Sequence, residues 1–127
     1  MEKLIIDSTS KTPGIVFDPD KDKFEIFGRS LPDNVIITYK PLFAWIEENM
    51  PKIGKKHIVF NCRMNYLNSA STKVFSTFFL KLEKFYKEGA NIEVKWYYTD
   101  EDDILFDYEA LCKITTMPIT LIPVDEL

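Results

Sequence analysis

The ten residues MNYLNSASTK at positions 64–73 lie where an apolar strand is expected to become a helix. Before them, residues 58–62 (IVFNC) form a short apolar run, typical of a strand buried on both faces of a central sheet. After them, apolar side chains recur at intervals of one, three and four residues from Val74 to Tyr86, which predicts an amphipathic helix over about residues 70–88. A strand followed at once by a long helix predicts an α/β fold.

The residues before this unit predict a hairpin and a first helix. Residues 15–17 and 24–27 are apolar and flank the sequence DPDKDK (18–23), whose Pro and Asp residues favour a reversing turn. Residues 35–38 (VIIT) are ambiguous, because β-branched side chains favour a strand while their position suggests the approach to a helix. The helix is expected to begin near Pro41, since the first turn does not need the missing N–H.

The residues after it predict two more strands and a third helix. Residues 91–98 alternate between apolar and polar side chains, as a strand with one polar face does, and residues 119–122 form a last short strand. Between them, Thr99 or Asp100 can cap a helix. We therefore expect one domain over residues 1–127, an α/β sandwich with a four- or five-stranded mixed sheet, an N-terminal β-hairpin and about three helices.

Composition and charge exclude several classes of protein. The net charge of −4 argues against a surface for nucleic acid or for an anionic membrane. No apolar run approaches the roughly 20 residues of a membrane span, and the N-terminus lacks the pattern of a signal peptide. Cys62 and Cys112 lie far apart in the sequence, and we interpret them as two buried thiols. We expect a soluble, cytoplasmic domain.

Catalytic and metal-binding motifs are missing from the sequence. His57 is the only histidine, and the four glycines form no phosphate-binding loop. The acidic run at residues 100–103 lacks the ligand spacing of a calcium-binding loop. We interpret it as the first turn of a helix, where acidic side chains are favourable, and the alternative is a recognition patch for a basic partner. A hydrolase with Ser69 as nucleophile has no base nearby in sequence. We expect no enzymatic activity, no cofactor and no metal.

The hydroxyl groups at the strand-to-helix junction leave two interpretations open. Asn68 or Ser69 can serve simply as the helix cap, which the residue types by themselves favour. Alternatively, one hydroxyl is phosphorylated, because a helix N-terminus accommodates a phosphate through its free N–H groups and its positive dipole end. A phosphate there would add about −1.5 to −2 charges and expel a docked partner without changing the fold.

At this junction the sequence resembles the SiaC family of bacterial regulatory phosphoproteins. Residues 66–73 resemble the family's Leu/Phe-Asn-Thr/Ser segment before the helix. The other matching segments follow in the expected order and span nearly the whole chain: residues 31–34, Tyr39, Pro41, residues 45–48, residues 96–103 and residues 117–119.

The resemblance implies a fold and a site. The family is similar to STAS domains of the anti-sigma-factor-antagonist type, in which an Asp-Ser-Ser-Gly turn carries the phosphorylated serine, so a STAS-like sandwich is expected. Asn68 stands at the position of the Asp and Ser69 at that of the acceptor, which is threonine in many SiaC relatives. Ala70 and Ser71 replace the second Ser and the Gly, which leaves Ser71 and the nearby Thr72 as alternative acceptors.

The resemblance also implies a switch between partners. A kinase of the histidine-kinase fold would phosphorylate Ser69, and a PP2C-type phosphatase would reverse this. The unphosphorylated protein would bind and activate an effector, in relatives a GGDEF diguanylate cyclase tied to biofilm formation, through Asn68, Ser69, Ala70, Ser71 and Lys73. The alternative is a constitutive adaptor domain in which Asn68 and Ser69 only cap the helix.

Overall fold

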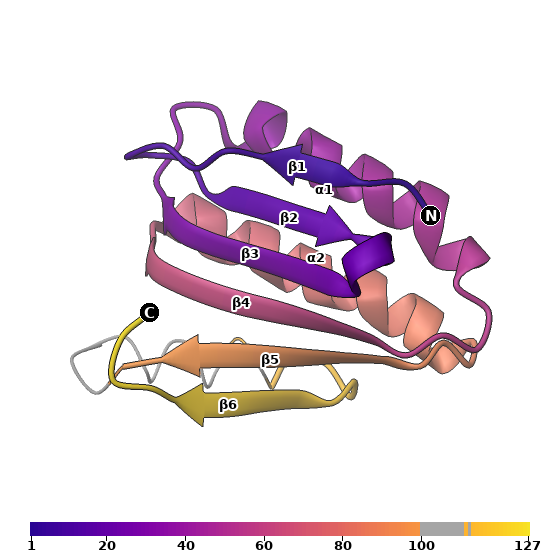
Figure 1. Ribbon diagram of the computed structural model, residues 1–127. Coiled ribbons are helices and arrows are strands. Elements are labelled where there is room, and N and C mark those ends of the chain that lie inside the picture. The colour runs from indigo at the N-terminus through magenta and orange to yellow at the C-terminus, as the bar shows by residue number, and fades with distance from the viewer. Residues whose placement is uncertain (100–110, 112) are drawn as a thin grey trace.

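A computed structural model describes residues 1–99, 111 and 113–127 of the chain. Its elements form two layers, a sheet and a pair of helices (Figure 1). The predicted third helix, the acidic run at residues 100–103 and Cys112 lie outside the described residues.

The sheet has six strands in sequence order, so the prediction of four or five was wrong. The strands are β1 (Leu4–Ile6), β2 (Gly14–Asp18), β3 (Lys23–Ser30), β4 (Ile58–Leu67), β5 (Ile92–Tyr98) and β6 (Ile119–Pro123). The predicted hairpin of β2 and β3 is confirmed, with β1 antiparallel beside it, and β3 to β6 are parallel. The additional strand is β1, whose three residues are too few to show a pattern and which is held by pairing with β2.

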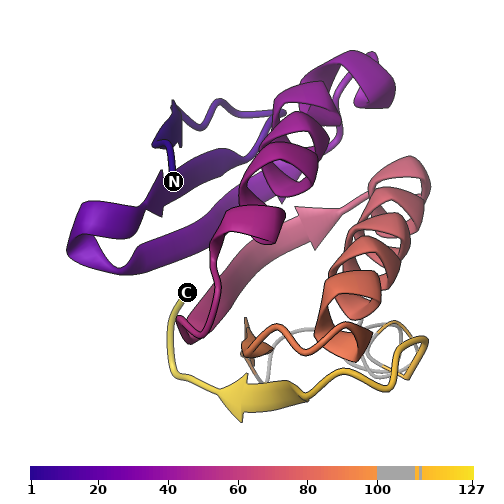
Figure 2. The ribbon, with the colours of Figure 1, turned by 90° about the vertical axis from the view of Figure 1, so that its right-hand side faces the viewer.

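Among the described residues, two α-helices cover one face of the sheet (Figure 2). Helix α2 (Ser69–Lys87) has its predicted bounds to within one residue. Helix α1 (Val35–Asn49) begins six residues before Pro41, because Asn34 caps it by accepting a hydrogen bond from the N–H of Ile37. None of the helices in the described part of the chain is long and apolar enough to span a membrane.

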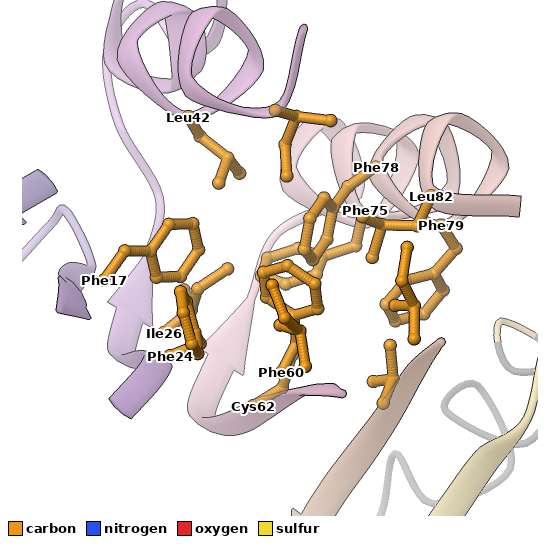
Figure 3. Packing of buried hydrophobic residues seen from close by; sticks show 14 of the residues in the cluster. Phe17, Phe24, Ile26, Leu42, Phe60, Cys62, Phe75, Phe78, Phe79 and Leu82 are labelled. Atoms are coloured by element: carbon orange, nitrogen blue, oxygen red, sulfur yellow. The ribbon is translucent and has the colours of Figure 1, made fainter. Parts of the chain in front are cut away.

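The core lies between the helices and the sheet and is largely aromatic (Figure 3). Phe60 of β4 lies at its centre, with ring centroids 5.4 Å from Phe17, 5.7 Å from Phe24 and 5.8 Å from Phe78. The predicted apolar face of α2 is confirmed, since Phe75, Phe78, Phe79, Leu82 and Phe85 are buried.

The opposite face of the sheet carries polar side chains, so the expectation that β4 is buried on both faces was wrong. Alternate residues of β4 are only half-buried, among them Val59, Asn61 and Arg63. The Arg63 guanidinium lies 3.8 Å from the ring centroid of Tyr97, and its Nε is 3.3 Å from Glu25 Oε1. Within the described residues, the half-buried polar side chains of β4 therefore lie on the face of the sheet opposite α1 and α2.

Candidate functional site

The candidate site lies where β4 ends and α2 begins. The side chain of Asn68 accepts a hydrogen bond from the N–H of Ser71 at 2.8 Å, which makes Asn68 the helix cap. The N–H of Asn68 donates to the carbonyl oxygen of Ser30, the last residue of β3, at 3.0 Å. The cap is therefore confirmed as Asn68, and Ser69 is left as the first residue of the helix.

An irregularity in strand pairing positions this corner. Gly28 pairs with Met64, but the next residue, Arg29, pairs with Tyr66, so β4 has one extra residue at Asn65. The extra residue shifts the alternation of side chains on β4, which brings Leu67 opposite Ser30, with both buried. Ser30 therefore points into the protein directly beneath the start of α2.

The three hydroxyls of the corner have different environments. Ser69 is exposed and opens to solvent. Thr72 is half-buried and its Oγ1 donates to the carbonyl oxygen of Asn68 at 3.1 Å. Ser71 is fully buried. The structure thus presents Ser69 to an enzyme or partner and keeps Ser71 away from both.

Ser71 belongs to a buried network of hydroxyl groups. Its Oγ lies 2.7 Å from the Oγ of Ser30, and it also donates to the Ser30 carbonyl oxygen at 3.1 Å. The Ser30 Oγ in turn lies 2.5 Å from the hydroxyl of Tyr39 on α1. Burial raises the pKa of Tyr39 to about 12, against the opposing effect of its hydrogen bonds, so the phenol stays protonated near neutral pH. The network ties β3, α1 and α2 together.

Ser30 was not identified from the sequence, and Tyr39 was noted only within a family motif. The available signal was alternation along β3, because Phe24, Ile26 and Ser30 are all buried on the same face. A serine at an inward position of a strand needs a polar partner. The sequence indicates that the Ser30 hydroxyl requires a buried hydrogen-bond partner. It does not show that Ser71 and Tyr39 are those partners.

A cleft of about 560 Å³ opens beside Ser69. Its described lining includes Thr72, Lys73, Lys113 and Ile114, among which the charged side chains are lysines. Together with the N-terminus of α2, these lysines make the surroundings of the Ser69 hydroxyl favourable for an anion.

The other predicted residues divide according to exposure. Ala70 and Lys73 are exposed on the first turns of α2, and Asn68 is half-buried, so a partner docked at this corner can touch them. Ser71, expected among the partner contacts, instead faces the core, because its hydroxyl satisfies the buried oxygens of Ser30. His57 precedes β4 and lies 3.7 Å from Glu93, at the opposite end of the strand from Ser69.

Comparisons with known proteins agree on one family. The model of the SiaC family of regulatory phosphoproteins matches residues 6–124. An uncharacterised protein of Pseudomonas aeruginosa (strain UCBPP-PA14) is 26% identical over 98 residues, which are 77% of each chain.

Solved structures show the same fold. The crystal structure of apo-SiaC from Pseudomonas aeruginosa superposes with a TM-score of 0.86 at 24% identity, over 96% of this chain and 99% of that one. SiaC in the crystal structure of the diguanylate cyclase SiaD in complex with its activator SiaC, also from Pseudomonas aeruginosa, gives a TM-score of 0.86 at 22% identity. That match covers 95% of this chain and 99% of the other.

Proposed function

Because the chain belongs to the SiaC family of regulatory phosphoproteins, we propose that it is a phosphorylation-controlled switch protein whose acceptor is Ser69. In its unphosphorylated form it binds and activates an effector of the diguanylate cyclase class, as SiaC activates SiaD in Pseudomonas aeruginosa. Phosphorylation of Ser69 releases the effector. The protein has no catalytic activity of its own and acts in the cytoplasm.

The exposure of Ser69 carries this proposal. Of the three hydroxyls at the corner, only that of Ser69 belongs to an exposed residue, whereas Ser71 is buried and Thr72 is bonded to the backbone. Since Asn68 already caps α2, Ser69 is not needed for helix stability and is available for modification. A phosphate there meets the positive end of the helix dipole and nearby lysines, so the fold tolerates it.

The proposal includes two modifying enzymes. A kinase of the histidine-kinase fold transfers the phosphate to Ser69, and a PP2C-type phosphatase removes it. The roles of these two enzymes, and the likeness to STAS domains, are what the family resemblance implies.

The acceptor is tested by mapping phosphate on the protein isolated from the cells that produce it. We expect phosphate on Ser69, located by mass spectrometry, and none in a Ser69→Ala variant. Phosphate on Thr72 alone would refute the assignment, and its absence under all growth conditions would refute the switch.

The effector is tested with the diguanylate cyclases encoded in the same genome. The wild type and Ser69→Ala should bind one cyclase and raise its synthesis of cyclic di-GMP from GTP, whereas Ser69→Asp should weaken both effects. If Ser69→Asp and the phosphorylated protein both bind the cyclase as tightly as the unphosphorylated wild type does, the constitutive adaptor domain is favoured, which the role of Asn68 as the helix cap also fits.

A further inference from the structure

The carbonyl oxygen of Ser30 holds the chain on both sides of Ser69. It accepts from the N–H of Asn68, the residue before Ser69, at 3.0 Å, and from the hydroxyl of Ser71, two residues after it, at 3.1 Å. Asn68 and Ser71 are also joined directly, because the side-chain oxygen of Asn68 accepts from the Ser71 N–H at 2.8 Å. The backbone around Ser69 is therefore bonded to the end of β3 as well as within the first turn of α2.

The position of the Ser69 hydroxyl depends on this backbone. A serine oxygen is separated from the backbone by a single rotatable bond, whose angle falls into a few staggered positions. Phosphoryl transfer requires the attacking oxygen to lie in line with the leaving group, and a displacement of about 1 Å can lower the rate about 100-fold. The contacts that fix the first turn of α2 therefore determine how well Ser69 can accept a phosphate.

The hydroxyl protons of the buried network can be assigned one after another. Each hydroxyl group has one proton to donate. Since the Ser71 hydroxyl donates to the Ser30 carbonyl oxygen, the contact of 2.7 Å between the Ser71 and Ser30 Oγ atoms uses the proton of Ser30. The contact of 2.5 Å between Ser30 Oγ and the Tyr39 hydroxyl then uses the proton of Tyr39. A chain of donors thus runs from Tyr39 through Ser30 to Ser71.

Tyr39 fixes the outer end of this donor chain on α1. Its side chain is fully buried, and its ring centroid lies 6.0 Å from that of Phe75 on α2, edge to face. Ser30 and Ser71 are fully buried as well. Bulk water therefore does not replace a lost partner, and removal of one hydroxyl leaves its neighbour unsatisfied.

We propose that Tyr39, Ser30 and Ser71 are positioning residues for the phosphorylation of Ser69. They hold the first turn of α2 in the geometry in which Ser69 Oγ attacks the γ-phosphorus of ATP on the kinase. A bond forms between that oxygen and the phosphorus, the bond from the phosphorus to the leaving oxygen of ADP breaks, and the hydroxyl proton passes to a base of the kinase. The inference rests on the proposed function and adds the residues that make Ser69 an efficient acceptor.

Initial rates of phosphorylation of the full chain test these roles. The enzyme is a purified kinase of the histidine-kinase fold from the same genome, supplied with ATP. Tyr39→Phe and Ser71→Ala should each lower kcat about tenfold and change KM little, because neither alters the surface that the kinase contacts. A merely structural role would instead reduce the folded fraction of the substrate, which raises the apparent KM and leaves kcat unchanged.

Asn49→Ala is the matched control. Asn49 is fully buried at the last residue of α1, where its side chain accepts from the Glu2 N–H and donates to the Trp45 carbonyl oxygen, each at 2.9 Å. The variant removes buried hydrogen bonds from the helix that carries Tyr39, but at the end remote from Ser69. It should keep the kcat of the wild type. An equal fall in kcat for Asn49→Ala and Tyr39→Phe would overturn the assignment.

The double variant of Tyr39→Phe and Ser71→Ala tests whether the two residues act in one chain. Because Tyr39 reaches Ser71 only through Ser30, the double variant should have the kcat of Ser71→Ala alone. Two effects that multiply would contradict the donor chain.

The failure of this inference differs from the failure of the proposed function. If the wild type is phosphorylated on Ser69 and both single variants keep its kcat, the network does not position the acceptor and the switch stands. If none of these kinases phosphorylates Ser69 of the wild type, the proposed switch is wrong and the positioning roles fall with it.

Discussion

Neighbouring hydroxyl groups at the start of α2 differ in what a modifying enzyme can reach. Ser69 is exposed, while Ser71, two positions later, has its hydroxyl within hydrogen-bonding distance of two oxygens of Ser30. Since a helix rotates by about 100° per residue, positions two apart face different directions. This rotation separates an acceptor on the surface from a structural serine in the interior.

The cap residue is expected to contribute stability independently of the acceptor. Asn68→Ala removes the oxygen that accepts from the N–H of Ser71, and it should lower the free energy of unfolding by about 1 kcal/mol. Urea denaturation of the two proteins measures this difference.

The control for this prediction is Asn68→Asp, which keeps a side-chain acceptor for the same N–H and should stay close to the wild type. If both variants lose equal stability, the cap hydrogen bond is not the cause. Ser69→Ala should leave the free energy of unfolding nearly unchanged, because its side chain is exposed.

At the scale of elements, Glu83 joins α2 to the segment that leads into β6. Its Oε1 lies 2.9 Å from Lys87 Nζ on the next turn and accepts from the Thr116 hydroxyl at 3.4 Å. The residue is 9% exposed although it carries a charge. Lys113 and Ile114, which line the cleft beside Ser69, belong to the same segment, so Glu83 helps to hold that side of the site.

This contact predicts a dependence of stability on acid pH. Hydrogen bonds from Thr115 and then from Lys87 lower the pKa of the Glu83 carboxyl. Because the folded-state pKa lies below that of the unfolded chain, the stabilisation is present above the unfolded pKa and is lost as the pH falls through the folded one.

Thermal unfolding of Glu83→Gln tests whether the ionised Glu83 carboxylate stabilises the fold. The variant should have a lower Tm than the wild type at pH 7, and the difference should shrink on acidification. Glu88→Gln is the control, since Glu88 is exposed at the end of the same helix and should show no such trend. A difference in Tm that does not change with pH would contradict the role of the ionised carboxylate.

At the scale of the whole molecule, the hydroxyl network joins the sheet to both helices. Tyr39 is fully buried and contacts Ser30 of β3, which in turn contacts Ser71 of α2. Ser30 and Ser71 are 41 positions apart and the three residues lie on three different elements, so the network forms only when those elements are packed together.

Because of the buried Tyr39 phenol, we expect the free energy of unfolding of the whole protein to fall at alkaline pH. The pKa of its phenol is raised to about 12 by burial, above that of an unfolded chain, so the stabilisation is present below pH 10 and is lost between about pH 10 and 12. The loss from this group amounts to about 3 kcal/mol at most.

Comparison of the wild type with Tyr39→Phe isolates the contribution. At pH 8 the variant should be less stable by about 1 kcal/mol, because it loses one buried hydrogen bond. Above pH 10 this deficit should shrink and then reverse. Denaturation curves whose difference stays constant from pH 8 to 11.5 would contradict the assignment.

Local patterns in the sequence were sufficient for much of the fold. The spacing of apolar residues predicted α2 to within one residue, and turn residues predicted the hairpin of β2 and β3. They failed for β1, which depends on pairing with β2, and for the start of α1. At the start of α1 the cap at Asn34 is itself a local signal, but only the burial of Tyr39 against the core shows that the helix extends back to it rather than starting near Pro41.

For the candidate site, the sequence by itself determined that hydroxyl groups gather where a strand meets a helix, because caps and helical periodicity are local properties of the chain. Only the tertiary structure decided which hydroxyl is available. Ser30 and Ser71 are 41 positions apart, and a bulge beside Gly28 brings Ser30 beneath α2.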